Sequence, residues 1–240
     1  MRALGSALLL VSLAAGAEDR VAAARASKSK AIQQLFETAK VAYPPGEILL
    51  RAFKEERELE LWAGPRGRPL TRIKTYPICA ESGTLGPKRQ EGDEQIPEGF
   101  YAVNRFNPWS NFHLALGLDY PNASDRILGA RGRLGGDIMI HGNCVTVGCI
   151  PIQNDPIEEV YLVAVDAQAN GQARIPVHIF PVRLDEAGMK SLSARPGVIP
   201  PLLAFWRSLQ AGYLLFEKTR RPPLVTVDPH TGEYRVAREP

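Results

Sequence analysis

The chain has 240 residues, of which 45% are hydrophobic and 23% charged, with a formal net charge of +3 and a pI near 8.8. This length and composition suit one globular domain with additional segments and exclude wholesale disorder. The mild positive charge suits an anionic polymer as partner. Lys and Arg are scattered among acidic residues and form no basic stripe, so we expect no nucleic-acid partner.

Residues 1–17 have the features of a secretory signal peptide. Arg2 gives a positive start, an apolar stretch rich in Leu and Ala follows, and Ala-Gly-Ala at 15–17 supplies small residues before Glu18. The stretch is shorter than the ~20 apolar residues that span a bilayer, which disfavours a membrane anchor as the alternative. No Cys follows it, which disfavours a lipoprotein. We therefore expect cleavage, a periplasmic location and no membrane span in the mature protein.

The next segment predicts a helix followed by β-structure. Residues 19–43 carry an apolar stripe with helical spacing, and Pro44-Pro45-Gly46 ends the helix. Beyond it, apolar runs separated by turn residues predict strands. These strands are expected at 47–53, 57–63, 70–78, 100–104, 113–118, 137–141 and 175–184.

Two further helices are predicted in the second half of the chain. Asp155 as N-cap, Pro156 at the first helical position and Glu158 completing a capping box predict a helix that ends at Gly171. A second helix follows Pro200-Pro201, and residues 224–236 resemble a small hairpin. The chain is therefore expected to be an α+β protein, a β-rich domain with helices packed on it.

The stretch DIMIHGNCVTVGCI at 137–150 carries the candidate chemistry. An apolar strand ends in His141-Gly142, and Cys149 follows eight residues after the His. An imidazole within reach of a thiol can take its proton and lower its pKa. Gly148 lets the backbone approach a substrate carbonyl, and N–H groups there can stabilise an oxyanion. The pattern therefore predicts Cys149 as nucleophile and His141 as its base.

Three other interpretations of this stretch compete. The His and the cysteines could simply be packed in a buried strand and loop. His141, Cys144 and Cys149 could bind a metal, but a fourth ligand at a recognisable spacing is missing. A zinc deaminase needs an acid two residues after the His, where this chain has Asn143, so that interpretation fails. We expect no metal and no organic cofactor.

The paired motif resembles the catalytic signature of L,D-transpeptidases with a YkuD-type domain, His-Gly followed by [Ser/Thr]-x-Gly-Cys. In this chain it is His141-Gly142 and TVGCI at 146–150. Further similarity to the YafK-like branch lies in SGTLGPK at 82–88, GD at 92–93, PEGFY at 97–101, FHL at 112–114 and DYPN at 119–122. Many relatives carry a second His where this chain has Val147, and Arg where it has Pro151, so contacts of those residues are not transferred.

The resemblance, which covers about residues 47–184, implies an α+β fold with mixed β-sheets and packed helices. We expect a helical segment at 18–46, the catalytic domain at 47–195, and a helix and hairpin extension at 196–240. The resemblance further implies that Cys149 attacks the carbonyl of the L-centre of diaminopimelate in a peptidoglycan stem tetrapeptide. The Gly142 carbonyl would hold the imidazole, and a thioacyl-enzyme would form. Another diaminopimelate, the lysine of a wall-anchored lipoprotein, or water would then resolve it.

Four more residues are candidate substrate contacts: Thr146, Gly148, His113 and Lys88. His113 could instead be a strand residue satisfied by the backbone, and Lys88 could be part of a charged turn in solvent. Two alternatives remain for the function. One is an amidase that releases wall-linked lipoprotein by the same thioacyl chemistry, and the other is a non-catalytic wall-binding protein. The intact His141 and Cys149 pair argues against the second.

Three cysteines in an oxidising compartment imply one free thiol. A bridge between Cys79 and Cys144 would pin the loop between base and nucleophile, whereas a bridge between Cys144 and Cys149 would silence the enzyme. All three could also stay reduced. A bridge requires Cα atoms within ~7 Å, so geometry decides between these outcomes.

Overall fold

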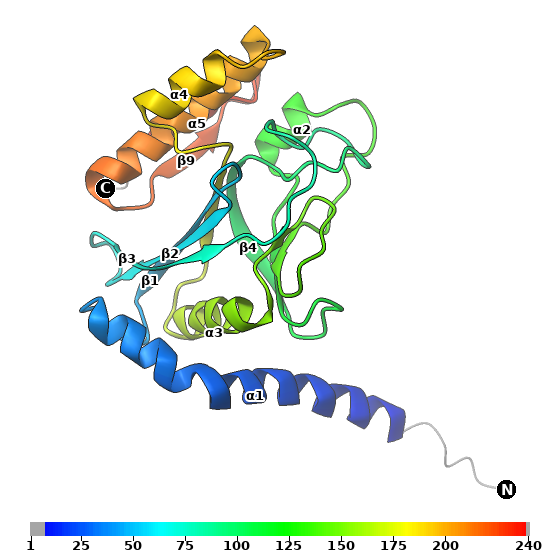
Figure 1. The fold of residues 1–240 in the computed structure, drawn as a ribbon, viewed down its shortest axis with the longest axis vertical. Helices are drawn as coiled ribbons and strands as arrows, with labels where there is room; N and C mark the ends of the chain where they lie inside the picture. The colour runs from blue at the N-terminus through cyan, green and yellow to red at the C-terminus, as the bar shows by residue number, and fades with distance from the viewer. Residues whose placement is uncertain (1–7, 239–240) are drawn as a thin grey trace, which may run out of the picture.

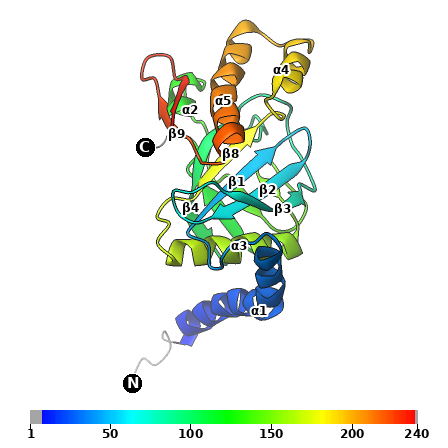
Figure 2. The same cartoon turned by 90° about the vertical axis from the view of Figure 1, so that its left-hand side faces the viewer.

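The computed structural model describes residues 8–238, and side chains from residue 20 onward. An 8-stranded sheet lies between two helical layers, with a small hairpin at one end (Figures 1 and 2). The helices are α1 Leu8–Thr38, α2 Ala123–Leu128, α3 Asn154–Ala169, α4 Glu186–Ser193 and α5 Pro200–Thr219. The strands are β1 Glu47–Phe53, β2 Glu58–Gly64, β3 Thr71–Pro77, β4 Gly99–Asn107, β5 Ala115–Leu118, β6 Met139–His141, β7 Ile150–Pro151, β8 Pro176–Phe180, β9 Leu224–Val227 and β10 Tyr234–Ala237.

The large sheet is mixed, in the order β3-β2-β1-β8-β4-β5-β6-β7, and β9 and β10 form the hairpin. Strand β1 is antiparallel to β2 and parallel to β8. Side chains alternate across a strand, so Ile48 and Leu50 enter the main core while Phe53 joins the aromatic cluster on the other face. Both faces of β1 are therefore covered, which explains its nearly unbroken apolar sequence.

Helix α3 packs against one face of the sheet, and α1 lies across α3 (Figure 1). Ion pairs join the two helices: Arg25 to Asp166 at 2.8 Å, and Lys28 to Asp155. The first part of α1 extends beyond the body of the molecule (Figure 1). In this layer α3 contacts strands β1, β5 and β6, and α1 contacts β3.

The opposite face is covered by α5, whose Trp206 is fully buried beside Phe180 and Phe53. The Trp206 indole donates to Glu98 Oε2 at 2.7 Å, and the other oxygen of Glu98 accepts from the Lys54 ammonium at 2.9 Å. Burying such an ion pair requires that its other groups be hydrogen-bonded. Lys54 meets this requirement by donating also to the carbonyls of Thr84, Gly86 and Ile96.

The α+β class and the mixed sheet are confirmed, and most predicted elements occur within a few residues of their expected positions. The strands expected at 113–118 and 137–141 begin later, at Ala115 and Met139. His113 and Asp137 have φ of 73° and 53°, which a strand does not accommodate. The predicted capping box at α3 is wrong. The N-cap is Gln153, which makes no side-chain capping bond. Asp155 and Glu158 do not cap the helix, because they bond to Lys28 and His113.

Helices α2 and α4 were not predicted. Asn122 and Asp125 form a capping box at α2, and Asp185 caps α4, signals that the sequence does contain. Residues 1–7 of the predicted signal peptide lie outside the described residues. Its remaining residues, 8–17, belong to α1. Among the helices of the described chain, none has the length and apolar character needed to cross a membrane.

Candidate active site

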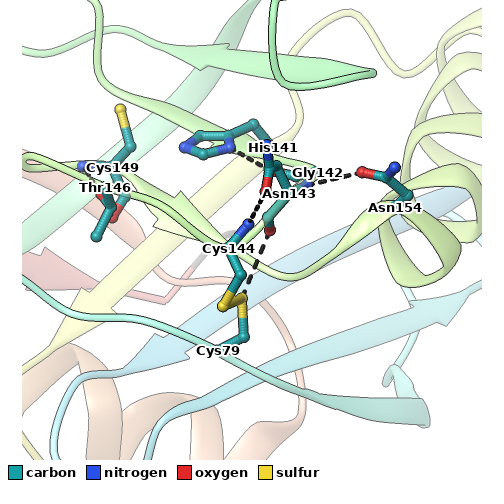
Figure 3. Close-up of a disulfide and its surroundings, with 8 residues drawn as sticks. All are labelled: Cys79, His141, Gly142, Asn143, Cys144, Thr146, Cys149 and Asn154. Atoms are coloured by element: carbon teal, nitrogen blue, oxygen red, sulfur yellow. Dashed lines mark hydrogen bonds between the residues drawn. A yellow bond between two sulfur atoms is a disulfide. The ribbon is translucent and has the colours of Figure 1, made fainter.

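The register of two short strands brings the proposed base and nucleophile to the same face. Strands β6 and β7 are parallel, with Ile140 opposite Ile150, and both of these side chains are fully buried in the core. His141 and Cys149 each lie one residue away from this pair, so their side chains project to the other face. Figure 3 shows the imidazole and the thiol on the same side of the connecting loop, with the far edge of the ring turned toward Cys149.

One ring nitrogen of His141 has a fixed role. Nδ1 lies 2.5 Å from the Gly142 carbonyl oxygen (Figure 3). A carbonyl oxygen can only accept, so Nδ1 carries the hydrogen and Nε2 is the basic nitrogen of the neutral ring. The side chain is only 1% exposed, and this burial lowers its pKa below the ordinary 6.5, although the bond to Gly142 opposes the shift. The imidazole is therefore neutral near pH 7.

The Cys149 thiol is half-buried and lies 3.6 Å from the Asp137 carbonyl oxygen. Burial raises the pKa of Cys149, and the Asp137 charge adds to this effect, while the Met139 backbone and the Lys88 charge oppose it. The expectation that imidazole would populate the thiolate is therefore wrong for this state. Within the described chain, the hydrogen bonds found for the thiol are with backbone groups, the Asp137 carbonyl and the Met139 backbone, and not with His141. The thiol is protonated at rest, and a nearby base is needed to activate it.

The turn before Cys149 is held by two hydroxyl groups. Thr146 Oγ1 accepts from the Cys149 N–H at 2.9 Å and donates to the Cys149 carbonyl at 2.8 Å. Ser82 Oγ accepts from the Gly148 N–H at 2.7 Å. Both candidate oxyanion donors are therefore occupied, and a substrate oxyanion would have to replace one of these hydroxyls. Gly148 has φ of 85°, and a Cβ on it would lie 3.1 Å from the Gln95 carbonyl oxygen.

A disulfide joins Cys79 to Cys144, with Cα atoms 5.7 Å apart (Figure 3). The bridge proposed between these two cysteines is confirmed, and Cys149 is the free one. With its sulfur in the bridge, Cys144 has no thiolate to offer, so the three-ligand metal interpretation does not fit this structure. Asn143 adds a second anchor because its N–H donates to Asn154 Oδ1 of α3 at 2.7 Å.

His113 and Lys88 do not fit the structural alternatives given for them, and their expected contact with substrate stays a prediction. The His113 ring bonds to Glu158 of α3, Nε2 to Oε1 at 2.8 Å, so a side chain and not the backbone satisfies it. Lys88 is buried, with its ammonium 2.6 Å from Asp93 Oδ1, so the expected solvent-exposed turn is wrong. The charge of Lys88 still reaches the site, where it lowers the pKa of Cys149.

The sequence patterns did not identify Phe112 or Ser82 as part of the site, nor Arg20, whose guanidinium lies 3.3 Å from the His113 carbonyl. Phe112 stacks on His141, with ring centroids 4.7 Å apart and an interplanar angle of 30°. Its place in the FHL segment beside His113 was the available signal. Ser82 also lines a cavity of about 390 Å³, together with Gly83, Thr84 and Leu85. Neither Cys149 nor His141 lines this cavity, so it adjoins the nucleophile's turn without containing the thiol.

Comparison with known proteins identifies a close relative. The chain is 38% identical over 182 residues to the protein of Escherichia coli (strain K12) named "Putative L,D-transpeptidase YafK", and the match covers 75% of this chain and 70% of that protein. The protein of that name from Escherichia coli O157:H7 matches equally. The chain belongs to the L,D-transpeptidase family. No family model matches it.

Two solved proteins from other bacteria also align with the chain. The helical cell shape determining protein Pgp2 from Campylobacter jejuni gives a TM-score of 0.45 at 19% identity, covering 76% of this chain and 73% of that one. A mutant of Pgp2 aligns over 57% of this chain and 47% of that chain, about half its length. Bd1075 from Bdellovibrio bacteriovorus gives a TM-score of 0.43 at 18% identity, covering 78% and 79%.

Proposed function

We propose that the protein is a cysteine acyltransferase that acts on diaminopimelate-containing stem peptides of peptidoglycan. The observation that carries the proposal is the placement of one free thiol and one buried imidazole on the same side of the connecting loop. Cys149 stays outside the disulfide, and His141 projects from the same face with Nε2 as its basic nitrogen. Membership of the L,D-transpeptidase family supports the reaction class.

In the acylation step, Nε2 of His141 takes the Cys149 proton as the sulfur attacks the carbonyl of the L-centre of diaminopimelate. The tetrahedral oxyanion then collapses, the amide bond to the next residue breaks, and the leaving amine takes the proton back from Nε2. The product is a thioester on Cys149. The bond from Nδ1 to the Gly142 carbonyl favours this step, since it orients the ring and stabilises the positive charge that develops on it.

In the second step, an acceptor attacks the thioester carbonyl and His141 removes the acceptor's proton. The C–S bond then breaks, and the imidazolium returns the proton to the Cys149 sulfur, which regenerates the thiol. An amine of another diaminopimelate would give a cross-link, a lipoprotein lysine would give anchoring, and water would give hydrolysis. Thr146 and Gly148 are proposed to shape the turn on which this chemistry occurs. Lys88 would act through its charge, because its ammonium already bonds to Asp93 and to the Gln90 carbonyl.

The proposed location is the periplasm, reached through a signal peptide at 1–17. The apolar stretch and the Ala-Gly-Ala sequence before Glu18 motivate this proposal. N-terminal sequencing of exported protein tests it, and the expected first residue is Glu18. A mature protein that begins at Met1 would contradict it.

Mass spectrometry of the protein incubated with a carbapenem tests the nucleophile. We expect one covalent adduct, located on Cys149, in the wild type and none in Cys149→Ala. Arg25→Ala is the control, because it breaks an ion pair between α1 and α3 and leaves the thiol in place. An adduct that persists in Cys149→Ala, or its absence from the wild type, would reject the proposal.

Incubation with purified muropeptides then identifies the acceptor. A cross-linked dimer supports transfer to diaminopimelate, and a shortened stem without a new bond supports hydrolysis. Release of lipoprotein from lipoprotein-linked muropeptides would support the amidase alternative. Unchanged muropeptides from a protein that does form the carbapenem adduct would show that the thiol is reactive and that peptidoglycan stems are not its substrate.

A further inference from the structure

The loop at 108–113 covers the proposed base because of how two strands are paired. Strands β5 and β6 are antiparallel, with Ala115 opposite His141, so residues just before Ala115 lie beside those just after His141. The Gly142 N–H accordingly donates to the Leu114 carbonyl at 3.1 Å. A Cβ on Gly142 would lie 2.7 Å from the Phe112 carbonyl oxygen. The loop is therefore in direct contact with the residue whose carbonyl holds the imidazole.

The ring of Phe112 shields the ring of His141 from water. The two centroids are 4.7 Å apart, and Phe112 is 38% exposed whereas His141 is only 1% exposed. One face of Phe112 thus meets solvent and the other covers the imidazole. A buried imidazole disfavours its charged form, so this cover helps to keep His141 neutral and able to accept a proton.

The loop depends on two other elements for its shape. One nitrogen of the Arg20 guanidinium, from α1, lies 3.2, 3.0 and 3.3 Å from the carbonyls of Pro108, Ser110 and His113. From α3, Glu158 bonds to the His113 ring at 2.8 Å. His113 has φ of 73°, in the left-handed region that non-glycine residues seldom adopt, although His is one of the commoner exceptions together with Asn and Asp.

We infer that Phe112 is a positioning residue for His141 and that Arg20 holds the loop that presents it. The first turns of the mature chain are in this way coupled to the base of the active site. Arg20 lies three residues after the proposed cleavage point, so processing there retains the contact and cleavage beyond Arg20 removes it. The inference rests on the proposed role of His141 as the base.

The groups that could influence the titration of His141 come from several elements. They are the Cys149 thiol, the His113–Glu158 pair, and Asp137 with Lys88, whose charges act on the thiol. The lowered pKa of His141 itself is caused by burial, with the Gly142 bond opposing it. Loss of the Phe112 cover should therefore raise this pKa toward its ordinary value.

The test is a proton NMR titration of His141, combined with the rate of carbapenem acylation. The chain has 4 histidines, so a His141→Gln spectrum assigns the resonance. We expect Phe112→Ala to raise the pKa at which His141 titrates. The midpoint of the acid limb in the plot of acylation rate against pH should move to higher pH by the same amount. Acylation should also slow about tenfold, which is part of the ~10²–10⁴-fold that a positioned base supplies. Phe112→Tyr, which keeps the ring, should restore all three.

Arg20→Ala should shift the titration in the same direction by less, because the loop loosens but the ring remains. Arg25→Ala is the matched control: it breaks an ion pair between α1 and α3 without contacting the loop. The inference is overturned if His141 titrates identically in the wild type and in Phe112→Ala, or if Arg25→Ala reproduces the effect of Arg20→Ala. The NMR titration does not depend on catalysis, so a shifted titration in a protein that forms no adduct would reject the proposed function alone.

Discussion

Two loops meet at His141, and they are held in different ways. The loop at 142–149 is fixed by a disulfide, by two hydroxyl groups and by Asn154 at the start of α3. The loop at 108–113 depends mainly on one exposed guanidinium from α1 and one carboxylate from α3. These polar contacts are exposed or partly buried and none is covalent, so the second loop should open more easily than the loop that carries the disulfide. The fold thus fixes the proposed nucleophile firmly, and the loop that covers the proposed base more weakly.

Replacing His141 removes the group that both loops contact, and it should have the largest effect on the rate of acylation. In His141→Gln the carbonyl of Gly142 retains a polar neighbour, but no side chain is left that can take the thiol proton. Acylation of Cys149 by a carbapenem should slow by about 10²–10⁴-fold at pH 7, the usual contribution of a positioned base. Stopped-flow or mass-spectrometric rates measure this, and a rate within threefold of the wild type, about half a decade, would exclude His141 as the base.

Removal of the disulfide should destabilise the protein and loosen the nucleophile loop. The bridge closes a loop with a sequence separation of 65. Its loss in Cys79→Ser/Cys144→Ser should lower the free energy of unfolding by up to ~4 kcal/mol in the chain-entropy model. Denaturant unfolding measures the change, and Cys149→Ser is the control because it removes a thiol outside the bridge. Equal stabilities would show that the bridge contributes nothing.

Gly148→Ala tests whether the turn before the nucleophile requires glycine. The φ of 85° and a Cβ position 3.1 Å from the Gln95 carbonyl oxygen predict strain of ~1–2 kcal/mol together with displacement of the turn. Acylation should slow along with the loss of stability. Gly132→Ala is the control, since Gly132 has φ of 115° with nothing within 4 Å of its Cβ position. If both variants lose stability equally and both retain full rates, contact with Gln95 does not position Cys149.

The difference between the loops also explains what the sequence could predict. The nucleophile loop lies within one short motif, so its His-Gly and Gly-Cys elements indicated both proposed roles and the place of the turn. Cysteine count and compartment narrowed the disulfide to three outcomes, and only the 5.7 Å Cα distance selected one. Most strands were predictable because period-2 apolar patterns survive wherever one face of a strand is buried.

The residues that hold the loop at 108–113 could not be predicted from the sequence, because they are distant from the loop along the chain. Arg20 lies 93 residues from His113 and Glu158 lies 45 residues from it. Glu158 matched a capping pattern equally well, and tertiary pairing with His113 took precedence over that local use. The buried state of Lys88 was missed for a different reason. Its partner Asp93 is near in sequence, but burial of Lys88 depends on how residues 82–98 fold against the rest of the protein.

Thr146→Val should give the smallest change, and it separates the two functions of the threonine hydroxyl. Valine keeps the shape of the side chain but loses the bonds to the Cys149 N–H and carbonyl, each worth ~0.5–1.5 kcal/mol net. If those bonds only shape the turn, stability falls by about that amount and acylation slows a few-fold, while Thr146→Ser restores both because it keeps the hydroxyl. The released Cys149 N–H would, however, also become available to a substrate oxyanion. An acylation rate that rises in Thr146→Val despite lower stability would therefore identify this N–H as an oxyanion donor that the hydroxyl occupies at rest. An unchanged rate together with unchanged stability would mean that the hydroxyl neither fixes the turn nor competes with substrate.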